Sequence, residues 1–120
     1  MKFHILFISM LLLGCFGIMD MPYMCKNAAD ADLRDRCFST LALRDANAEM
    51  CKEVQDPTAR DYCVMRIAIS KLDELECSHI ESSLKEKCEH VVQGLRQNNS
   101  WVCVLVKDNL TAELCRMRVS

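Results

Sequence analysis

The stretch CKEVQDPTARDYC, residues 51–63, decides the fold. It begins and ends with cysteine, and Asp56-Pro57 stands near its middle. The same arrangement recurs along the chain with a period of 26 residues, which gives Cys25, Cys51, Cys77 and Cys103. A second series follows these by 11 or 12 residues and comprises Cys37, Cys63, Cys88 and Cys115. A fixed period of this size indicates a tandem array of one supersecondary unit.

Residues typical of helix N-caps predict two helices in each repeat. Their side-chain oxygens accept the free amide protons of a first helical turn. We expect a short helix over about Asn47–Val54 and a longer one over Pro57–Lys71, with proline at its first position. The expected N-caps are Asn47, Asp73 and Asn99 for the short helices, and Asp30, Asp56, Ser82 and Asp108 for the longer ones.

The spacing of the cysteines predicts that the chain reverses inside each repeat. Two cysteines 12 residues apart on one continuous helix would be about 18 Å apart, whereas a disulfide needs Cα atoms within about 7 Å. Pairing within each repeat is the economical choice, although eight cysteines leave many connectivities open. The expected pairs are Cys25–Cys37, Cys51–Cys63, Cys77–Cys88 and Cys103–Cys115.

The pattern resembles that of tandem helical-hairpin repeats, the class that includes tetratricopeptide-like solenoids. The resemblance covers roughly Met21 to Ser120. It implies stacked hairpins that present an extended surface to partners. We therefore expect an all-α fold: a short solenoid of four 26-residue helical hairpins over residues 23–120, each stapled by one disulfide. Three glycines and two prolines also disfavour a fold rich in β-hairpins.

The N-terminus reads as an export signal, because Lys2 precedes a short apolar run from Ile5 to Leu13. That run is too short for a transmembrane helix. The following Leu12-Leu13-Gly14-Cys15 resembles the lipobox of prokaryotic lipoproteins, which implies a lipid on the Cys15 thiol and anchoring in a membrane. On this interpretation residues 1–14 are the signal peptide and residues 15–22 a tether. The alternative is ordinary signal cleavage just downstream, for example after Gly17.

The number of cysteines supports lipidation of Cys15, which without a lipid would be either removed or left as an odd cysteine. Without Cys15 the chain keeps eight, an even number suited to four disulfides in an oxidising compartment. We therefore expect a protein that is membrane-anchored on the extracytoplasmic side, or secreted.

Composition and motifs exclude several functions. The net charge is −2 and the charges are interleaved, which disfavours nucleic-acid binding. No CX2C pair supports zinc binding or thiol–disulfide catalysis. No GXSXG, HEXXH or glycine-rich phosphate loop occurs, so we expect no enzyme activity, metal or cofactor. We interpret His90 and Glu86 as a solvated pair on one helix face.

Two further patterns concern surface residues. The dyads Arg34-Asp35, Arg60-Asp61 and Lys85-Glu86 recur at one repeat position. We interpret the acid as favouring the helix dipole and the base as pairing with the adjacent repeat, rather than as a ligand-binding ladder. Trp101 stands where other repeats have Tyr23, Glu49 and Leu75, and we expect it to close the last repeat pair rather than to be an exposed contact residue.

The expected function is non-enzymatic. We expect an exported, membrane-anchored lipoprotein that acts as a protein-binding or structural scaffold. The alternative is a soluble, secreted, cysteine-rich effector or inhibitor.

Overall fold

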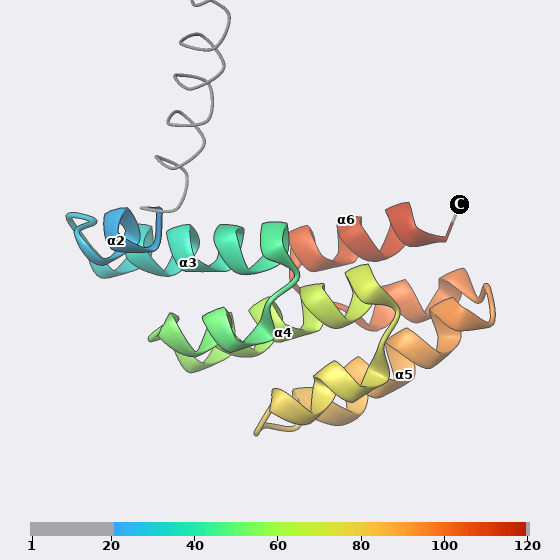
Figure 1. Ribbon diagram of the computed structural model, residues 1–120. Helices are drawn as coiled ribbons and strands as arrows, with labels where there is room; N and C mark the ends of the chain where they lie inside the picture. The colour runs from blue at the N-terminus through green and yellow to red at the C-terminus, as the bar shows by residue number, and fades with distance from the viewer. Residues whose placement is uncertain (1–20, 120) are drawn as a thin grey trace, which may run out of the picture.

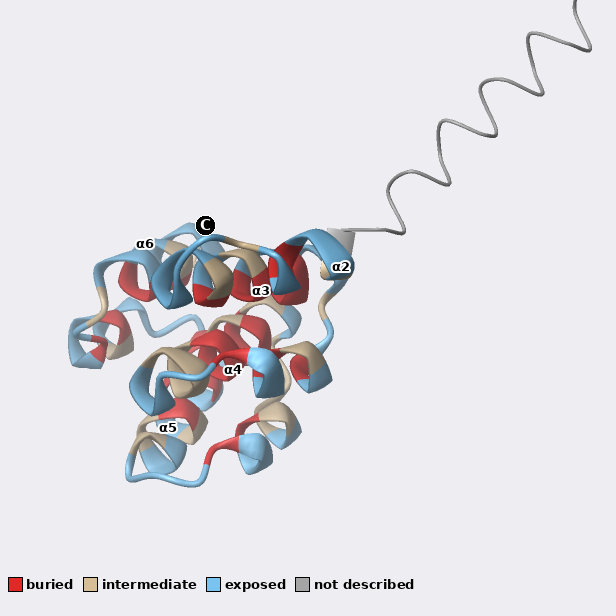
Figure 2. Cartoon of the chain, turned by 90° about the vertical axis from the view of Figure 1, so that its left-hand side faces the viewer, coloured by how far each residue is buried: buried red, intermediate tan, exposed pale blue. Residues whose placement is uncertain are grey.

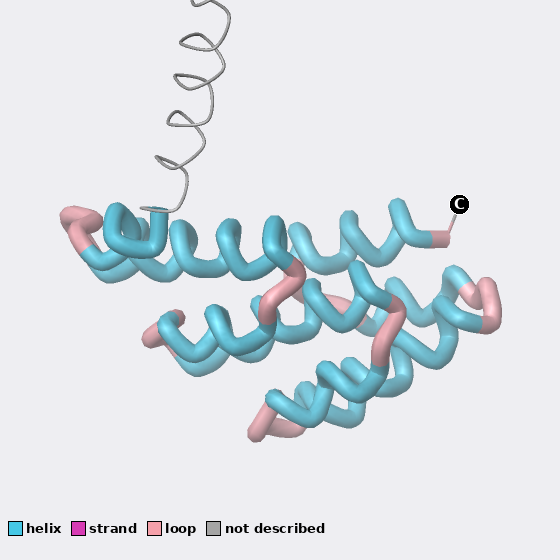
Figure 3. The backbone as a smooth tube through the Cα atoms, viewed as in Figure 1, coloured by secondary structure: helices cyan, strands magenta, loops and turns pink. Residues whose placement is uncertain are grey.

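A computed structural model describes residues 21–119 of the chain (Figure 1). Every regular element in this range is helical, and short and long helices alternate (Figure 3). The elements are α2 (Met21–Lys26), α3 (Ala31–Asp45), η2 (Ala48–Glu53), α4 (Pro57–Lys71), η3 (Glu74–His79), α5 (Leu84–Arg96), η4 (Ser100–Leu105) and α6 (Asn109–Arg118). The predicted four helical hairpins are therefore confirmed. Because α2 begins at Met21, the last two residues of the expected tether belong to the first hairpin.

Side-chain caps start most of these helices, as the sequence predicts. Asp30, Asp56 and Asp108 each accept a hydrogen bond from the backbone N–H three residues later. In the third hairpin, which has one residue fewer, α5 begins only at Leu84, after Ser83 rather than after the predicted Ser82. Ser82 still accepts a hydrogen bond from the Leu84 N–H at 3.2 Å.

The second, third and fourth short helices are 3₁₀ helices rather than α-helices. Asn47, Asp73 and Asn99 cap them, each accepting from the N–H two residues later. Each is six residues long, which is more than the three or four residues that most 3₁₀ helices span.

The turn that ends each of the first three long helices repeats with the same 26-residue period. Ala46, Leu72 and Asn98 all have left-handed backbone geometry, with φ of 50°, 50° and 59°. The residue after each one is the N-cap of the next 3₁₀ helix, and its N–H donates back into the preceding long helix. One three-dimensional turn therefore joins each long helix to the next hairpin.

One disulfide joins the two helices of each hairpin. The pairs are Cys25–Cys37, Cys51–Cys63, Cys77–Cys88 and Cys103–Cys115, with Cα atoms 5.4–5.8 Å apart. These are the pairs expected from the spacing. Seven of the eight cysteines are buried and Cys37 is partly buried, so the disulfides lie within the core.

The helices form three layers, which Figures 1 and 2 show from two directions. The outer layer contains α2, α3 and α6, the middle layer contains η2, α4 and η4, and the third contains η3 and α5. Helix α4 lies at the centre and packs against α3, α5 and α6. The fourth hairpin thus returns to the second instead of stacking only on the third, which a purely linear solenoid would not do.

Packing explains the position of α4. Its Cys63, Val64, Met65, Ile67, Ala68 and Ile69 are all buried. A close approach also joins α5 to η4, because a Cβ placed on Gly94 would overlap the side chain of Val102. A larger residue at position 94 would therefore force the Val102 side chain or the backbone to move.

Candidate functional site

A cleft of about 490 Å³, lined mostly by polar residues, lies between α3, α4 and α6. Asp32, Arg36 and Thr40 line it from α3, while Arg66 and Leu110 line it from α4 and α6. Helix α4 forms the floor of the cleft, and α3 and α6 lie on its two sides.

Arg66 joins the second hairpin to the fourth at this floor. Its Nε donates to the Thr111 hydroxyl oxygen at 3.1 Å, and its Nη2 lies 3.9 Å from Asp108 Oδ2. The Thr111 hydroxyl in turn donates to Asp108 at 2.6 Å. Burial lowers the pKa of Arg66, and the negative charge of Asp108 partly offsets that effect.

Asp35 joins the first hairpin to the second on another wall of the cleft. Its two carboxylate oxygens accept hydrogen bonds from the backbone N–H groups of Gln55 and Asp56. These contacts, like those of Arg66, link one hairpin to another. The cleft is therefore lined by contacts that join the first and fourth hairpins to the second.

This result changes the interpretation of the repeated dyads. The acid of the first dyad, Asp35, makes the contact with the adjacent repeat that we expected from the base. Arg60 instead donates to the carbonyls of Val54 and Gln55 in its own hairpin. The Arg34 Nε is buried without a hydrogen-bond partner.

The short helix η4 presents an apolar surface to solvent. Trp101 is 80% exposed and Val104 is 74% exposed, and Leu105 is also exposed. The expectation that Trp101 closes the last repeat pair is therefore wrong, since such a residue would be buried. Leu75, at the same repeat position on η3, is exposed as well.

The sequence contains a signal for this surface that our expectations did not use. Val104 occupies the repeat position of Lys26, Lys52 and Ser78. Leu105 occupies that of Asn27, Glu53 and His79. Apolar residues in the fourth repeat thus replace residues that are polar in the other three, and the structure leaves both of them exposed.

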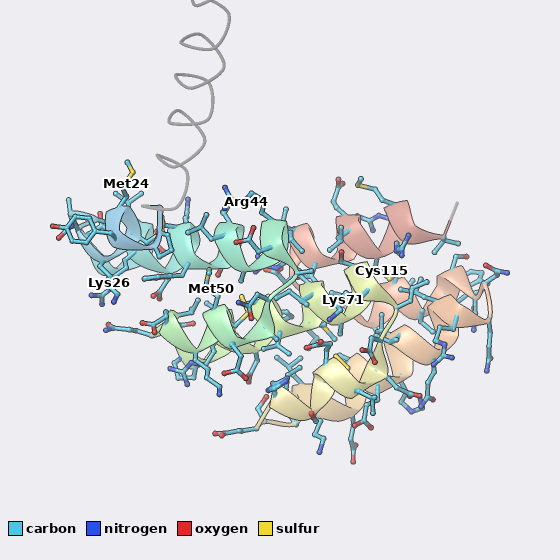
Figure 4. All side chains as sticks on the ribbon, viewed as in Figure 1. Met24, Lys26, Arg44, Met50, Lys71 and Cys115 are labelled. Atoms are coloured by element: carbon cyan, nitrogen blue, oxygen red, sulfur yellow. A yellow bond between two sulfur atoms is a disulfide. The ribbon has the colours of Figure 1, made fainter. Side chains whose placement is uncertain are left out.

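A second exposed apolar area lies on the first hairpin. A groove of about 440 Å³ runs along α3 and is lined by Met24, Leu33 and Leu41, with Arg36, Cys37, Thr40 and Arg44 beside them. Figure 4 shows Met24 and Arg44 pointing away from α4. The groove therefore opens on the outer side of the outer layer.

The other predicted site residues lie apart from these surfaces or outside the described range. Within residues 21–119, no group of three or more His, Cys, Asp or Glu side chains is arranged to hold a metal ion. His90 and Glu86 are both exposed on α5. Cys15 and the rest of the lipobox-like segment precede the described residues.

Comparison with known proteins gives no match: no family model, no curated protein and no solved structure matches the chain. Among the described helices, none is both long and apolar enough to cross a membrane. Four disulfides in a small helical domain fit an oxidising, extracytoplasmic environment.

Proposed function

We propose that this protein is an exported, lipid-anchored, non-enzymatic module that binds a protein partner through η4. The observation that carries the proposal is the exposed apolar surface of Trp101, Val104 and Leu105. Large exposed apolar side chains grouped on one element mark interaction sites, and tryptophan is enriched among residues that dominate binding energy.

The disulfides support a rigid binding surface. Cys103–Cys115 fixes η4 to α6, and η4 also packs against α5. A surface held in this way loses little conformational entropy on binding, which favours affinity.

The partner can be found with a photo-crosslinking amino acid at position 104 in the exporting cell, with position 81 as an exposed control. The purified partner is then titrated against the protein. Since Trp101 is the only tryptophan, its fluorescence reports the binding directly. We expect an adduct from position 104 and a blue-shifted emission on binding.

The decisive variant gives η4 the polar residues of the second repeat, Val104→Lys with Leu105→Glu. We expect binding to weaken by about 2 kcal/mol, roughly 30-fold in Kd, with an unchanged circular dichroism spectrum. Equal affinity of the variant and the parent protein would rule out η4 as the binding surface.

The anchor is tested separately by mass spectrometry of the native protein. A diacylglyceryl group on Cys15 supports the lipoprotein. A mature N-terminus beyond Gly17 supports instead the soluble, secreted, cysteine-rich effector or inhibitor.

A further inference from the structure

The outer layer carries a second set of exposed apolar side chains, distinct from those of η4. Five of the nine large apolar side chains that are exposed in residues 21–119 belong to this layer. They are Tyr23, Met24, Leu33, Leu110 and Met117. Such side chains on one layer need an explanation, because they would be more stable out of water.

Helix geometry places Leu33, Leu110 and Met117 on the side of the layer that faces away from α4. In α6 the buried residues are Thr111, Ala112 and Cys115. At 100° per residue, Leu110 and Met117 lie on the opposite side of the helix. Leu33 lies in the same way opposite the buried side of α3, where Phe38 and Ala42 are.

The exposed sides of α3 and α6 lie next to each other across the cleft. Arg36 and Thr40 line both the apolar groove on α3 and the cleft whose far wall includes Leu110. Figures 1 and 2 both show α3 and α6 together in the outer layer. The apolar side chains therefore extend from α2 along α3 to α6.

The chain enters the described structure on this same layer. Helix α2 is the first described element and begins at Met21, six residues after Cys15. Six residues span at most about 20 Å when fully extended. An acyl group on Cys15 would therefore hold the outer layer within that distance of a membrane.

We propose that the face formed by α2, α3 and α6 lies flat on a lipid surface. This proposal rests on the proposed anchoring through Cys15. Apolar side chains on an amphipathic face insert at the boundary between headgroups and acyl chains. The charges nearby are paired, as in Arg36–Asp32 and Arg116–Glu113, so docking does not require anionic lipid. In this orientation η4, in the middle layer, remains open to a protein partner.

Hydroxyl-radical footprinting of the lipidated protein in phosphatidylcholine vesicles tests the orientation. Met24 and Met117 are 64% and 70% exposed, and Trp101 provides the control on another layer. Compared with a Cys15→Ser chain without vesicles, we expect several-fold less oxidation at both methionines and no change at Trp101. Adding phosphatidylglycerol should leave this pattern unchanged.

A pair of matched variants separates docking from folding. Leu33→Gln with Leu110→Gln should restore oxidation of Met24 and Met117, whereas Leu75→Gln, at a leucine on η3 that is even more exposed, should not. Flotation with the vesicles reports the anchor independently. Protein that floats with both methionines fully reactive, or with only Met24 protected, would overturn flat docking while leaving the anchor intact.

Discussion

The carboxylate of Asp35 accepts a hydrogen bond from the backbone N–H of Gln55 at 2.9 Å, across 20 positions of sequence. The other oxygen accepts from the next N–H at 3.2 Å. One side chain of the first hairpin thus fixes the loop that leads into α4. This contact sets the angle between two hairpins, which their own disulfides do not constrain.

Replacing Asp35 should therefore destabilise the fold. Asp35→Ala removes two hydrogen bonds to a charged acceptor, and we expect a loss of about 2 kcal/mol in the free energy of unfolding. The matched control is Asp61→Ala at the same position of the second hairpin, where we expect less than about 0.5 kcal/mol. Urea denaturation with disulfides intact measures both, and similar losses would show that Asp35 has no special role.

At Gly94 the expected effect of Gly→Ala on the free energy of unfolding is opposite to the one that helix propensity predicts. In an open helix, Gly→Ala stabilises by up to about 1 kcal/mol. Here the added methyl group would overlap Val102, so Gly94→Ala should destabilise by about 1–2 kcal/mol.

The control for this prediction is a double-mutant cycle. In a Val102→Ala background both obstructing methyl groups are gone and only Cβ remains close, so Gly94→Ala should destabilise much less than in the parent protein. Thermal unfolding of the parent, the two single variants and the double variant gives the coupling free energy between positions 94 and 102. Additive effects would show that α5 and η4 do not meet at this point.

The joint between the second and fourth hairpins depends on the Thr111 hydroxyl. Thr111→Val keeps the shape of the side chain but removes the acceptor for Arg66 and a donor to Asp108. We expect a loss of about 1–3 kcal/mol. Hydrogen exchange should show α6 opening more readily.

Thr40→Val is the control for this change, since the Thr40 hydroxyl is exposed and bonds only within its own helix. We expect less than about 0.5 kcal/mol for it. If the two variants were equally stable, the network at the floor of the cleft would contribute nothing to joining the hairpins.

Glu49 should titrate below its ordinary pKa of 4.5, because Lys52 Nζ bonds to its carboxylate at 2.7 Å. A pKa that is lowered in the folded state adds stability above the unfolded-state value, and that stability is lost as the pH falls through the folded value. The relevant pH range is therefore acidic, below about 4.5.

NMR titration of the Glu49 carboxyl measures this directly. Lys52→Met should return the pKa toward 4.5, whereas Lys26→Met, at the same position of the first repeat, should leave it lowered. A pKa that does not respond to Lys52→Met would mean that the ion pair does not form in solution.

Local features of this fold could be predicted from sequence because their causes are local. A cap such as Asp56 acts within three residues, and the pairing of Cys51 with Cys63 needs only a chain reversal between them. The limits of α4 follow from the same signals. Only the 3₁₀ geometry of the later short helices and the start of α5 differ from expectation.

Long-range features could not be predicted in this way. The return of α6 to α4 depends on the angles that the three turns between hairpins set between successive hairpins. No sequence pattern predicts these angles. The bridging role of Asp35 depends on the same geometry. The exposure of Trp101 is indicated only together with its neighbours Val104 and Leu105, because the other repeats have polar residues at the two corresponding positions.

The central place of α4 limits how this protein can change in evolution. Repeat proteins commonly gain or lose whole units, because each unit touches only those beside it. Here duplication of the third hairpin would carry α6 away from Arg66 and leave part of α4 facing water. The number of hairpins between the second and the last is thus fixed by geometry.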